Sequence, residues 1–314
     1  MMETQVQSSV GQVVPVPAPL LQRVTPAIGL RFRRRGKNLR TGEIAYLWFS
    51  RLLIWGFAAL ILVPAVWVLG ASFQPGVTYT TSFFPTAFTW AHYQYLFSST
   101  DFLLWVRNSV LICTTVGVAT VLLVATMAYA FSRYRFPGRK YGLMSLLIIQ
   151  MFPAQMSFVA FYYLLLQVNS VDTLYGYILV MIGGGLPFNA WLFKGYIDSL
   201  PRDLEEAAYV DGASKFQAYL RIILPLTRPM MAVIFIFVWF GLYSDFIISS
   251  FLLTTQNNFT VALGLYSLSQ GQSFLINWTQ FAAAAVVGSA PLLIVFLLAQ
   301  RFLVAGLARG AVKG

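Results

Sequence analysis

The chain has 314 residues, of which 58% are hydrophobic and 10% charged, and its mean hydropathy is +0.72. Soluble domains carry about 25% charged residues, so this composition excludes a soluble globular domain and predicts an integral membrane protein. The net charge of +11 does not indicate a nucleic-acid partner, because the basic residues lie between apolar runs rather than on a solvated face. One cysteine and one histidine exclude a disulfide framework, and we expect no metal site.

Six apolar stretches are long enough to cross a bilayer, which requires about 20 helical residues. In chain order they are residues 52–73, 108–132, 141–171, 173–193, 229–254 and 280–300. The third is long enough for one span and an outer loop. The sequence therefore predicts an all-α membrane protein with six transmembrane helices.

The basic residues predict the orientation, since they gather in cytoplasmic loops. All of them except Arg107 fall on one side of the predicted membrane, so we expect both termini in the cytoplasm. Residues 1–44 are predicted to be a flexible basic tail that contacts membrane lipid, and residues 45–314 the six-span domain. A cleavable signal peptide is the alternative for the start, but the first span has full membrane length, which favours an uncleaved anchor.

The predicted cytoplasmic loop at about 195–228 differs from the other loops on that side. It is charge-balanced, with five basic and five acidic side chains between Lys194 and Arg228, whereas the others are mainly basic. A balanced loop suggests a protein partner rather than a lipid surface. A solvated amphipathic linker is the alternative.

Local signals in this loop predict a helix, a turn and a second short helix. Ser199 is the candidate N-cap of the first helix, which has acidic residues in its first turn. Asp211–Gly212 breaks that helix. Ser214 and Gln217 have the spacing of a capping box that begins the second helix, and Pro225 is expected to end it.

The same loop carries a longer pattern, which runs Glu206-Ala-Ala208, three residues, Gly212, nine residues, and Ile222-x-Leu-Pro225. It resembles the EAA loop of permease subunits of binding-protein-dependent ABC importers. In that family the loop forms a coupling helix that docks on a separate ATPase subunit. The resemblance implies an ATPase-coupling interface made of Glu206, Ala207, Ala208, Asp211, Gly212, Ile222, Leu224 and Pro225. Within it, we expect Glu206 to make an ionic contact.

Other segments from about residue 45 onward also resemble this family. They include Ser-Phe-Gln-Pro at 72–75, Arg-Asn-Ser at 107–109, and the run at 128–139. The end of the chain resembles the tail of the shorter permease subunit of maltose-type sugar importers. In that type the tail reaches the ATPase interface, so the resemblance places Gly310 and Lys313 there.

The resemblance implies a type I ABC importer permease with six transmembrane helices and both termini cytoplasmic. The implied partners are an ABC ATPase dimer, a second homologous permease in a heterodimer, an extracytoplasmic solute-binding protein, and a sugar or oligosaccharide. The implied location is a bacterial or archaeal inner or plasma membrane. The sequence has no phosphate-binding loop of the Gly-x-x-x-x-Gly-Lys-Ser/Thr type, so the chain is not expected to be an enzyme or to bind a cofactor. ATP and Mg would be held by the partner.

Asn189, Tyr243 and Asp245 are the candidates for the translocation pathway. An ionisable group within a span costs about 3 kcal/mol and usually faces a cavity or a partner. Asp245 therefore either lines the path or accepts hydrogen bonds from a neighbour, with Ser244, Ser249 or Arg107 as candidates. The family usually has Trp-Asn-Asp/Glu-Phe where this chain has Tyr-Ser-Asp-Phe at 243–246, so a role of that Asn is lost.

Three further interpretations concern the fourth predicted span and the alternative functions. Residues 183–187, Gly-Gly-Gly-Leu-Pro, are not expected to hold a straight helix; the interruption would line a cavity or serve packing alone. The alternative function is a self-sufficient secondary transporter that uses Asp245, which would need coupling residues in the membrane. A membrane-embedded enzyme would need paired reactive residues, and the sequence places none there.

Overall fold

The computed structural model describes residues 41–76, 83–152, 154–270 and 277–311. The chain has two compact units, Met1–Phe57 and Ala58–Gly314. Of the first unit, the described part is the beginning of helix α1 (Thr41–Ser72), which starts before the predicted end of the tail at residue 44. The rest of that predicted tail lies outside the described residues. The described ranges are mainly helical and contain no β-strand.

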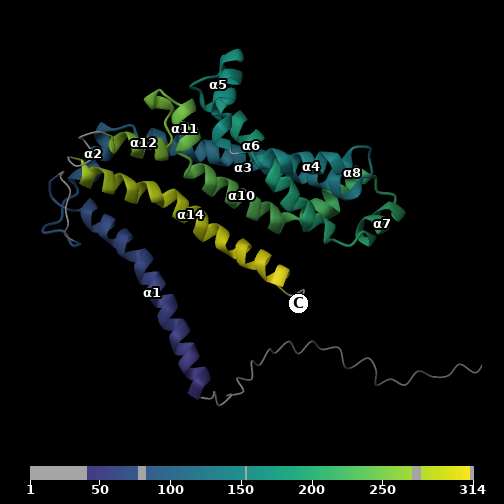
Figure 1. The fold of residues 1–314 in the computed structure, drawn as a ribbon, viewed down its shortest axis with the longest axis horizontal. Coiled ribbons are helices and arrows are strands. Elements are labelled where there is room, and N and C mark those ends of the chain that lie inside the picture. The colour runs from purple at the N-terminus through teal and green to yellow at the C-terminus, as the bar shows by residue number, and fades with distance from the viewer. Residues whose placement is uncertain (1–40, 77–82, 153, 271–276, 312–314) are drawn as a thin grey trace, which may run out of the picture. The chain divides into compact units, whose positions relative to one another are not determined.

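The second unit is built around four helices: α3 (Phe102–Arg133), α6 (Leu174–Asp198), α10 (Arg228–Tyr243) and α14 (Trp278–Ala311). Helix α3 packs along α6 and α10, and α10 also packs against α14 (Figure 1). Apolar side chains fill the interfaces because each helix has an almost continuous apolar sequence. The buried core between α3, α6 and α10 includes Val124, Ala128, Phe193, Ile197 and Ile234.

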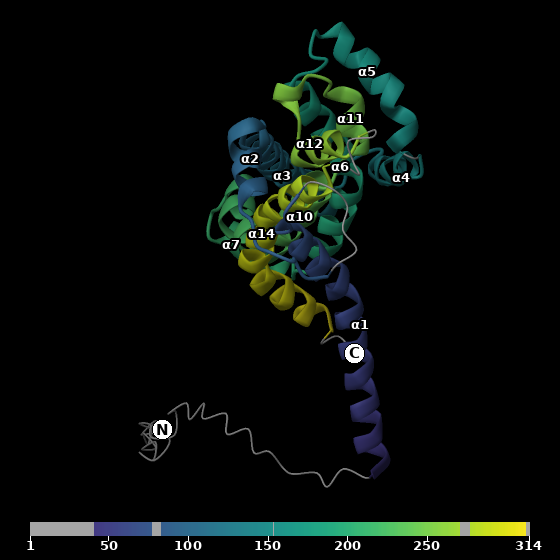
Figure 2. The ribbon, with the colours of Figure 1, turned by 90° about the vertical axis from the view of Figure 1, so that its left-hand side faces the viewer.

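Shorter elements connect these helices or pack beside them. They are α2 (Ala91–Ser99), α4 (Arg139–Gln150), η2 (Ala154–Ser157), α5 (Phe158–Gln167), α7 (Asp203–Val210), α8 (Lys215–Ala218), η3 (Tyr219–Ile223), α9 (Leu224–Leu226), α11 (Ile247–Leu252), η4 (Gln256–Asn258) and α12 (Val261–Leu268). Figure 1 shows α2 and α12 at one end of α3, and α7 and α8 at the other. Figure 2 shows α5 beside α11, where the rings of Phe158 and Phe251 have centroids 4.7 Å apart.

Helix length and composition support most of the predicted spans. Within the described part of the chain, four helices are long and apolar enough to cross a membrane: Tyr46–Ser72, Phe102–Arg133, Leu174–Asp198 and Trp278–Gln300. A fifth candidate is the pair Lys215–Leu226 and Arg228–Tyr243, which is bent by 69°. These correspond to the first, second, fourth, sixth and fifth predicted spans. The count of six and the side on which the termini lie stay predictions.

The third predicted span, residues 141–171, is not one helix. Helix α4 ends at Gln150, a 3₁₀ segment follows, and α5 has 10 residues, too few to cross a bilayer alone. The interval contains Pro153, and proline cannot donate the backbone hydrogen bond that continues a helix. Hydropathy could not reveal the break because apolar residues continue on both sides of it.

Residues 183–187 do not interrupt α6, which is helical from Leu174 to Asp198. Pro187 removes one backbone hydrogen bond from the helix, but the surrounding packing retains the helical path. The side-chain amide of Asn189 donates a 2.7 Å hydrogen bond to the carbonyl of Gly185. Residues on α6 such as Ala190 and Phe193 are buried, so tertiary contacts outweigh the weak helix propensity of the glycines.

Candidate functional site on the loop between α6 and α10

The first short helix of the loop, α7, has Asp203, Glu205 and Glu206 in its first turn, where the helix dipole favours negative charge. The prediction that Ser199 caps this helix is wrong. Ser199 is the C-cap residue of α6, and its hydroxyl donates a 2.7 Å hydrogen bond to the carbonyl of Tyr196. The N-cap position of α7 is occupied by Arg202, without a side-chain cap. The N-cap prediction was wrong because α6 ends only a few residues before α7 begins, and the sequence alone does not show which of the two helices Ser199 belongs to.

The turn after α7 and the start of α8 are confirmed. Gly212 has φ = +85°, a conformation that a residue with a Cβ adopts only with strain. The hydroxyl of Ser214 accepts the backbone N–H of Gln217 at 3.2 Å, and the Gln217 side chain accepts the backbone N–H of Ser214 at 2.8 Å. These two hydrogen bonds form the predicted capping box. The angle between α7 and α8 is therefore set locally.

Pro225 does not end the second helix as predicted. The chain remains helical through α8, η3 and α9 to Leu226, and the 69° bend comes where α10 begins. Before Pro225 the helix widens to a π-helix, in which the backbone N–H of Leu224 reaches the carbonyl of Tyr219. Because Pro225 has no N–H to donate, the wider turn accommodates it without ending the helix.

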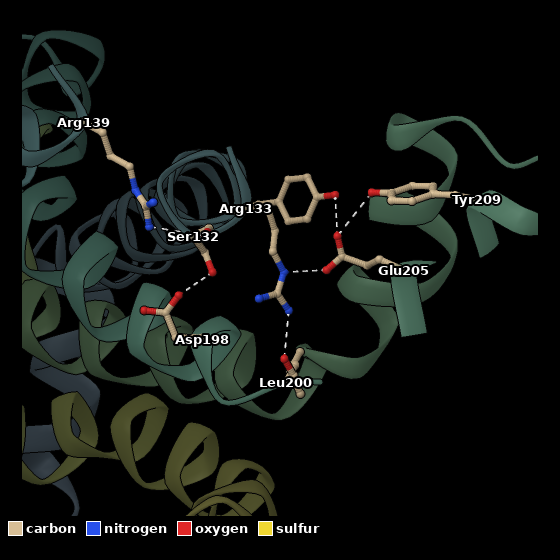
Figure 3. Close-up of polar contacts among 8 residues, drawn as sticks. Ser132, Arg133, Arg139, Asp198, Leu200, Glu205 and Tyr209 are labelled. Atoms are coloured by element: carbon tan, nitrogen blue, oxygen red, sulfur yellow. Dashed lines mark hydrogen bonds and ion pairs between the residues drawn. The ribbon is translucent and has the colours of Figure 1, made fainter. Parts of the chain in front are cut away.

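A buried carboxylate, Glu205, joins α7 to α3. Its side chain is 6% exposed and accepts a hydrogen bond from Arg133 Nε at 2.6 Å, which is also an ion pair (Figure 3). The other carboxylate oxygen accepts from the hydroxyls of Tyr129 at 3.1 Å and Tyr209 at 3.4 Å. Burial, and the neighbouring Glu205 charge, raise the pKa of Tyr209, which keeps its hydroxyl a neutral donor. A buried charge requires such partners.

The end of α3 makes further contacts around this ion pair. The second guanidinium nitrogen of Arg133 donates to the carbonyl of Leu200 at 3.0 Å. Ser132 Oγ donates to the Asp198 carboxylate at 2.5 Å, and that carboxylate also pairs with Lys194 on the preceding turn of α6. Figure 3 shows that Ser132 and Arg133 of α3 reach Asp198 at the end of α6, the carbonyl of Leu200 just after it, and Glu205 of α7. The last turn of α3 thus holds both the end of α6 and the start of the loop.

The outward side of the loop is apolar at several positions. Val210 is 88% exposed and Phe216 68%, and Leu204 and Leu220 are also exposed. Exposed apolar side chains on a loop outside the predicted spans are candidates for an interaction surface. We call Leu204, Ala207, Val210 and Phe216 the outward face.

Some of the residues predicted for the ATPase interface are exposed on the loop, and others lie in the interior of the protein. Glu206, Ala207, Asp211 and Gly212 are exposed, Ile222, Leu224 and Pro225 are half-buried, and Ala208 is buried. Ala208, Asp211, Gly212 and Ile222 line one hollow of about 450 Å³, whereas Leu224 packs on the core. Gly310 lies in the last turns of α14, and Lys313 falls outside the described residues.

Glu205 was not among the residues predicted from the sequence. The motif drew attention to Glu206, its neighbour, and two adjacent glutamates in a short helix look alike in sequence. Helical spacing does place Glu205 on the same face as Ala208, three residues later, and both are buried. Its partner Arg133 lies 72 positions earlier, so no local pattern indicated the pair.

Two of the three candidates for the translocation pathway lie in one groove between α6 and α10. Asn189 and Asp245 line it together with glycines and apolar side chains, and its volume is about 380 Å³. The Asp245 carboxylate accepts hydrogen bonds from the Tyr177 hydroxyl at 2.7 Å and from the backbone N–H of Ser249 at 3.0 Å. Ser249 is one of the partners that the sequence suggested.

Tyr243 lies elsewhere. Its side chain is buried, its hydroxyl donates a 2.6 Å hydrogen bond to the carbonyl of Gly288, and its ring stacks on Trp239 with centroids 5.0 Å apart. It therefore joins α10 to α14 rather than lining the groove. Among the described residues, no three His, Cys, Asp or Glu side chains are grouped so that they could hold a metal ion.

These features are those of a permease subunit, and comparison with known proteins agrees. Residues 121–309 match the family described as binding-protein-dependent transport system inner membrane component. The chain belongs to this family, whose members are membrane components of transport systems rather than enzymes.

Individual relatives cover nearly the whole chain. It is 39% identical over 281 residues to the galactooligosaccharides transport system permease protein GanQ of Bacillus subtilis (strain 168), covering 88% of this chain and 99% of that protein. It is 37% identical over 289 residues to the maltose/maltodextrin transport system permease protein MalG of Escherichia coli (strain K12), covering 86% and 97%.

Solved structures show the same fold. A chain of a bacterial ABC transporter involved in the import of the acidic polysaccharide alginate superposes with a TM-score of 0.73 at 20% identity, covering 84% of this chain and 98% of that one. A chain of the MetNI methionine ABC transporter gives 0.51 at 17% identity, covering 65% and 94%. The fold is that of a type I ABC importer permease.

Proposed function

We propose that this chain is one of two permease subunits of an ATP-driven importer in a bacterial cell membrane, and that the outward face binds the ATPase. The relatives are permease proteins of sugar transport systems, which supports the same role here. A second, homologous permease would complete the translocation path. An extracytoplasmic binding protein would deliver the solute, and ATP and Mg would be bound by the ATPase subunits.

The observation that carries the ATPase proposal is the two-sided construction of α7. Its inner side is fixed by the buried Glu205 and Ala208. Its outer side presents Ala207 and Val210 to solvent, next to the exposed carboxylate of Glu206. Covering an apolar side chain such as Val210 stabilises a complex by about 25 cal/mol per Å² removed from water. A rigid helix with an uncovered apolar face is suited to bind a partner and to be moved by it.

The position of α7 between the proposed ATPase and the spans suggests how transport would proceed. Closure of the ATPase dimer would displace α7, and the spans attached to it would change from an outward-open to an inward-open arrangement. The binding protein and the ATPase each shift this equilibrium by the difference in their affinity for the two states. The chain itself forms no covalent bond with ATP or solute.

The solute proposed is an oligosaccharide. The relatives named above are permease proteins of galactooligosaccharide and maltose/maltodextrin transport systems. The groove between α6 and α10 contains the amide of Asn189 and the carboxylate of Asp245. Both groups already make hydrogen bonds within the protein, so they would contribute to the path mainly by shape and water contacts. This favours a permease whose driving force comes from a partner over a secondary transporter that uses Asp245.

The test is co-purification of the ATPase from native membranes with variants of the outward face. Val210→Asp and Phe216→Asp place a charge on exposed positions, so we expect the fold to persist while ATPase recovery falls by about tenfold, the equivalent of 1.4 kcal/mol. Phe136→Asp is the matched control, since Phe136 is also an exposed phenylalanine and lies outside the outward face, three residues after α3 ends. Equal ATPase recovery with all three variants would contradict the proposal.

The alternative is tested in the same preparation. If the protein purifies alone and vesicles containing it accumulate solute without ATP, the chain is a secondary transporter. Asp245→Asn would then abolish accumulation.

A further inference from the structure

Helix α3 is attached by polar side chains at both of its ends. The first attachment, at its C-terminal end, is the Arg133–Glu205 pair with α7, supported by the hydrogen bond from Ser132 to Asp198. Both ion pairs among the described residues lie at this end. The Lys194–Asp198 pair lies within α6, whereas the Arg133–Glu205 pair joins two elements, α3 and α7.

The second attachment lies at the opposite end of the same helix. The Asn108 side-chain amide donates to the carbonyls of Asn257 at 2.8 Å and Phe259 at 3.1 Å. Ser109 Oγ accepts the backbone N–H of Val261 at 2.8 Å. Asn108 and Ser109 are 4% and 1% exposed, so water does not compete for these bonds. They fix residues 257–261, which run from η4 into the start of α12, to α3.

That segment is exposed just before the attachment. Gln256 is exposed on η4, and Asn258 donates a 2.6 Å hydrogen bond to the carbonyl of Asp172. Asp172 also accepts the backbone N–H of Thr254 at 2.8 Å. A label on the exposed residues 254–258 would therefore respond to a movement of the attached residues 257–261.

Helix α3 is suited to connect the two attachments mechanically. Asn108 and Arg133 lie on one uninterrupted helix, and their separation at 1.5 Å per residue is roughly 37 Å. The helix contains no proline, the usual cause of a kink. Its packing against α6 and α10 resists bending, so a displacement at one end is carried to the other.

We propose that α3 transmits movement of α7 to residues 254–261 at the other end of the protein, and that Arg133 and Asn108 are the positioning residues at the two attachments. This inference rests on the proposed function, because α7 is displaced when the ATPase binds nucleotide. Neither residue touches solute or ATP. Their role is to make the outer segment respond to the nucleotide state of the partner.

The experiment uses the assembled importer in lipid vesicles, with Gln256→Cys in this chain. The native Cys113 is buried, so the chain without the new cysteine provides the background. The rate of alkylation by a membrane-impermeant maleimide is measured with and without Mg-ATP. We expect nucleotide to change that rate by about fivefold, which is typical of coupled sites.

Arg133→Gln and Asn108→Ala should each reduce this response to a ratio near one. In the Asn108→Ala protein the ATPase should still bind and hydrolyse ATP, since that substitution is at the far end of α3. Arg135→Gln is the matched control for Arg133→Gln, because it removes the same charge two residues away at an exposed position. The exchange of Arg133→Glu with Glu205→Arg should restore part of the response.

Two results would overturn the proposal. A full nucleotide response in Asn108→Ala would show that the outer segment moves by another route, even if Arg133→Gln prevents assembly. A response lost equally in Arg135→Gln would show that general charge, not the buried pair, is responsible. If the ATPase fails to bind the parent chain at all, the proposed function fails together with this inference, and ATPase recovery distinguishes that case.

Discussion

The hydroxyl of Tyr177 lies 2.7 Å from Oδ2 of Asp245 and donates a hydrogen bond to it across 68 positions of sequence. The bond joins α6 to the junction of α10 and α11. The same oxygen accepts the backbone N–H of Ser249, which orders the first turn of α11. The sequence allowed two roles for Asp245, lining the translocation path or accepting hydrogen bonds from a neighbour. These hydrogen bonds give its carboxylate the second role.

Replacement of Tyr177 by Phe tests this role. Tyr177→Phe removes one donor and leaves the carboxylate of Asp245 with fewer partners, so we expect a loss of about 1–3 kcal/mol in the free energy of unfolding. Asp245→Asn removes the charge and keeps an acceptor, and should be milder. The measurement is the thermal unfolding midpoint in detergent. Transport abolished by Asp245→Asn at an unchanged midpoint would instead place the charge in the translocation path.

The hydrogen bonds that Asp172 accepts from residues 254–258 predict that the stability of the protein depends on pH. Burial alone would raise the pKa of Asp172, but hydrogen bonds from Thr255, Thr254 and Asn258 outweigh it and lower the pKa to about 2. The pKa of Asp in an unfolded chain is about 3.9. The hydrogen bonds to the ionised Asp172 therefore contribute their full stability above about pH 4, and this contribution is lost as the pH falls toward about 2.

We therefore expect Asp172→Asn to unfold at a lower temperature than the parent near neutral pH. The difference should shrink as the pH is lowered through about 4 toward about 2. Asp172 has φ = +56°, a conformation that asparagine also tolerates, so backbone strain does not confuse the comparison. Thermal unfolding followed at several pH values gives the answer, and a constant difference between the two proteins would contradict the assignment.

Features set by neighbouring residues could be predicted from the sequence. The capping box at Ser214 and Gln217 and the turn at Gly212 depend on residues within four positions, and both are present. Long apolar runs predicted α3, α6 and α14 because a membrane span needs only length and hydropathy. The family pattern located the loop, since it is a local spacing.

Features set by distant residues could not be predicted. Glu205 depends on Arg133, and residues 257–261 depend on Asn108, which is 149 positions from Asn257. The end of α4 at Gln150 was hidden by continued apolar sequence. The exposure of Glu206 and burial of Glu205 follow from how α7 lies on α3, and composition carries no information about that placement.

Gly212 offers a test of the turn between α7 and α8. At φ = +85° nothing lies within 4 Å of an added Cβ, so Gly212→Ala introduces backbone strain alone, about 1 kcal/mol. Gly138, at φ = +83° with the same open surroundings, is the matched control at the start of α4. Both variants should lower the unfolding midpoint by a similar small amount. ATPase recovery should fall in Gly212→Ala only, and an equal fall in Gly138→Ala would indicate a general loss of stability.

The adjacent pair Glu205 and Glu206 separates structure from binding within one helical turn. Glu205→Gln leaves the buried Arg133 guanidinium without its counter-charge, which costs about 3–5 kcal/mol when a buried pair is broken. Glu206→Gln alters an exposed side chain, so its unfolding free energy should change by no more than about 0.5 kcal/mol. The two proteins are compared by thermal unfolding and by ATPase recovery.

We expect the unfolding midpoint to fall in Glu205→Gln and to remain unchanged in Glu206→Gln, while ATPase recovery falls in the second protein at full stability. Such a split would mean that the motif glutamate contacts the partner and that its neighbour supports the helix presenting it. Unchanged recovery in Glu206→Gln would remove the proposed ionic contact. The apolar residues Val210 and Phe216 would then carry ATPase binding, because they remain exposed on the outward face.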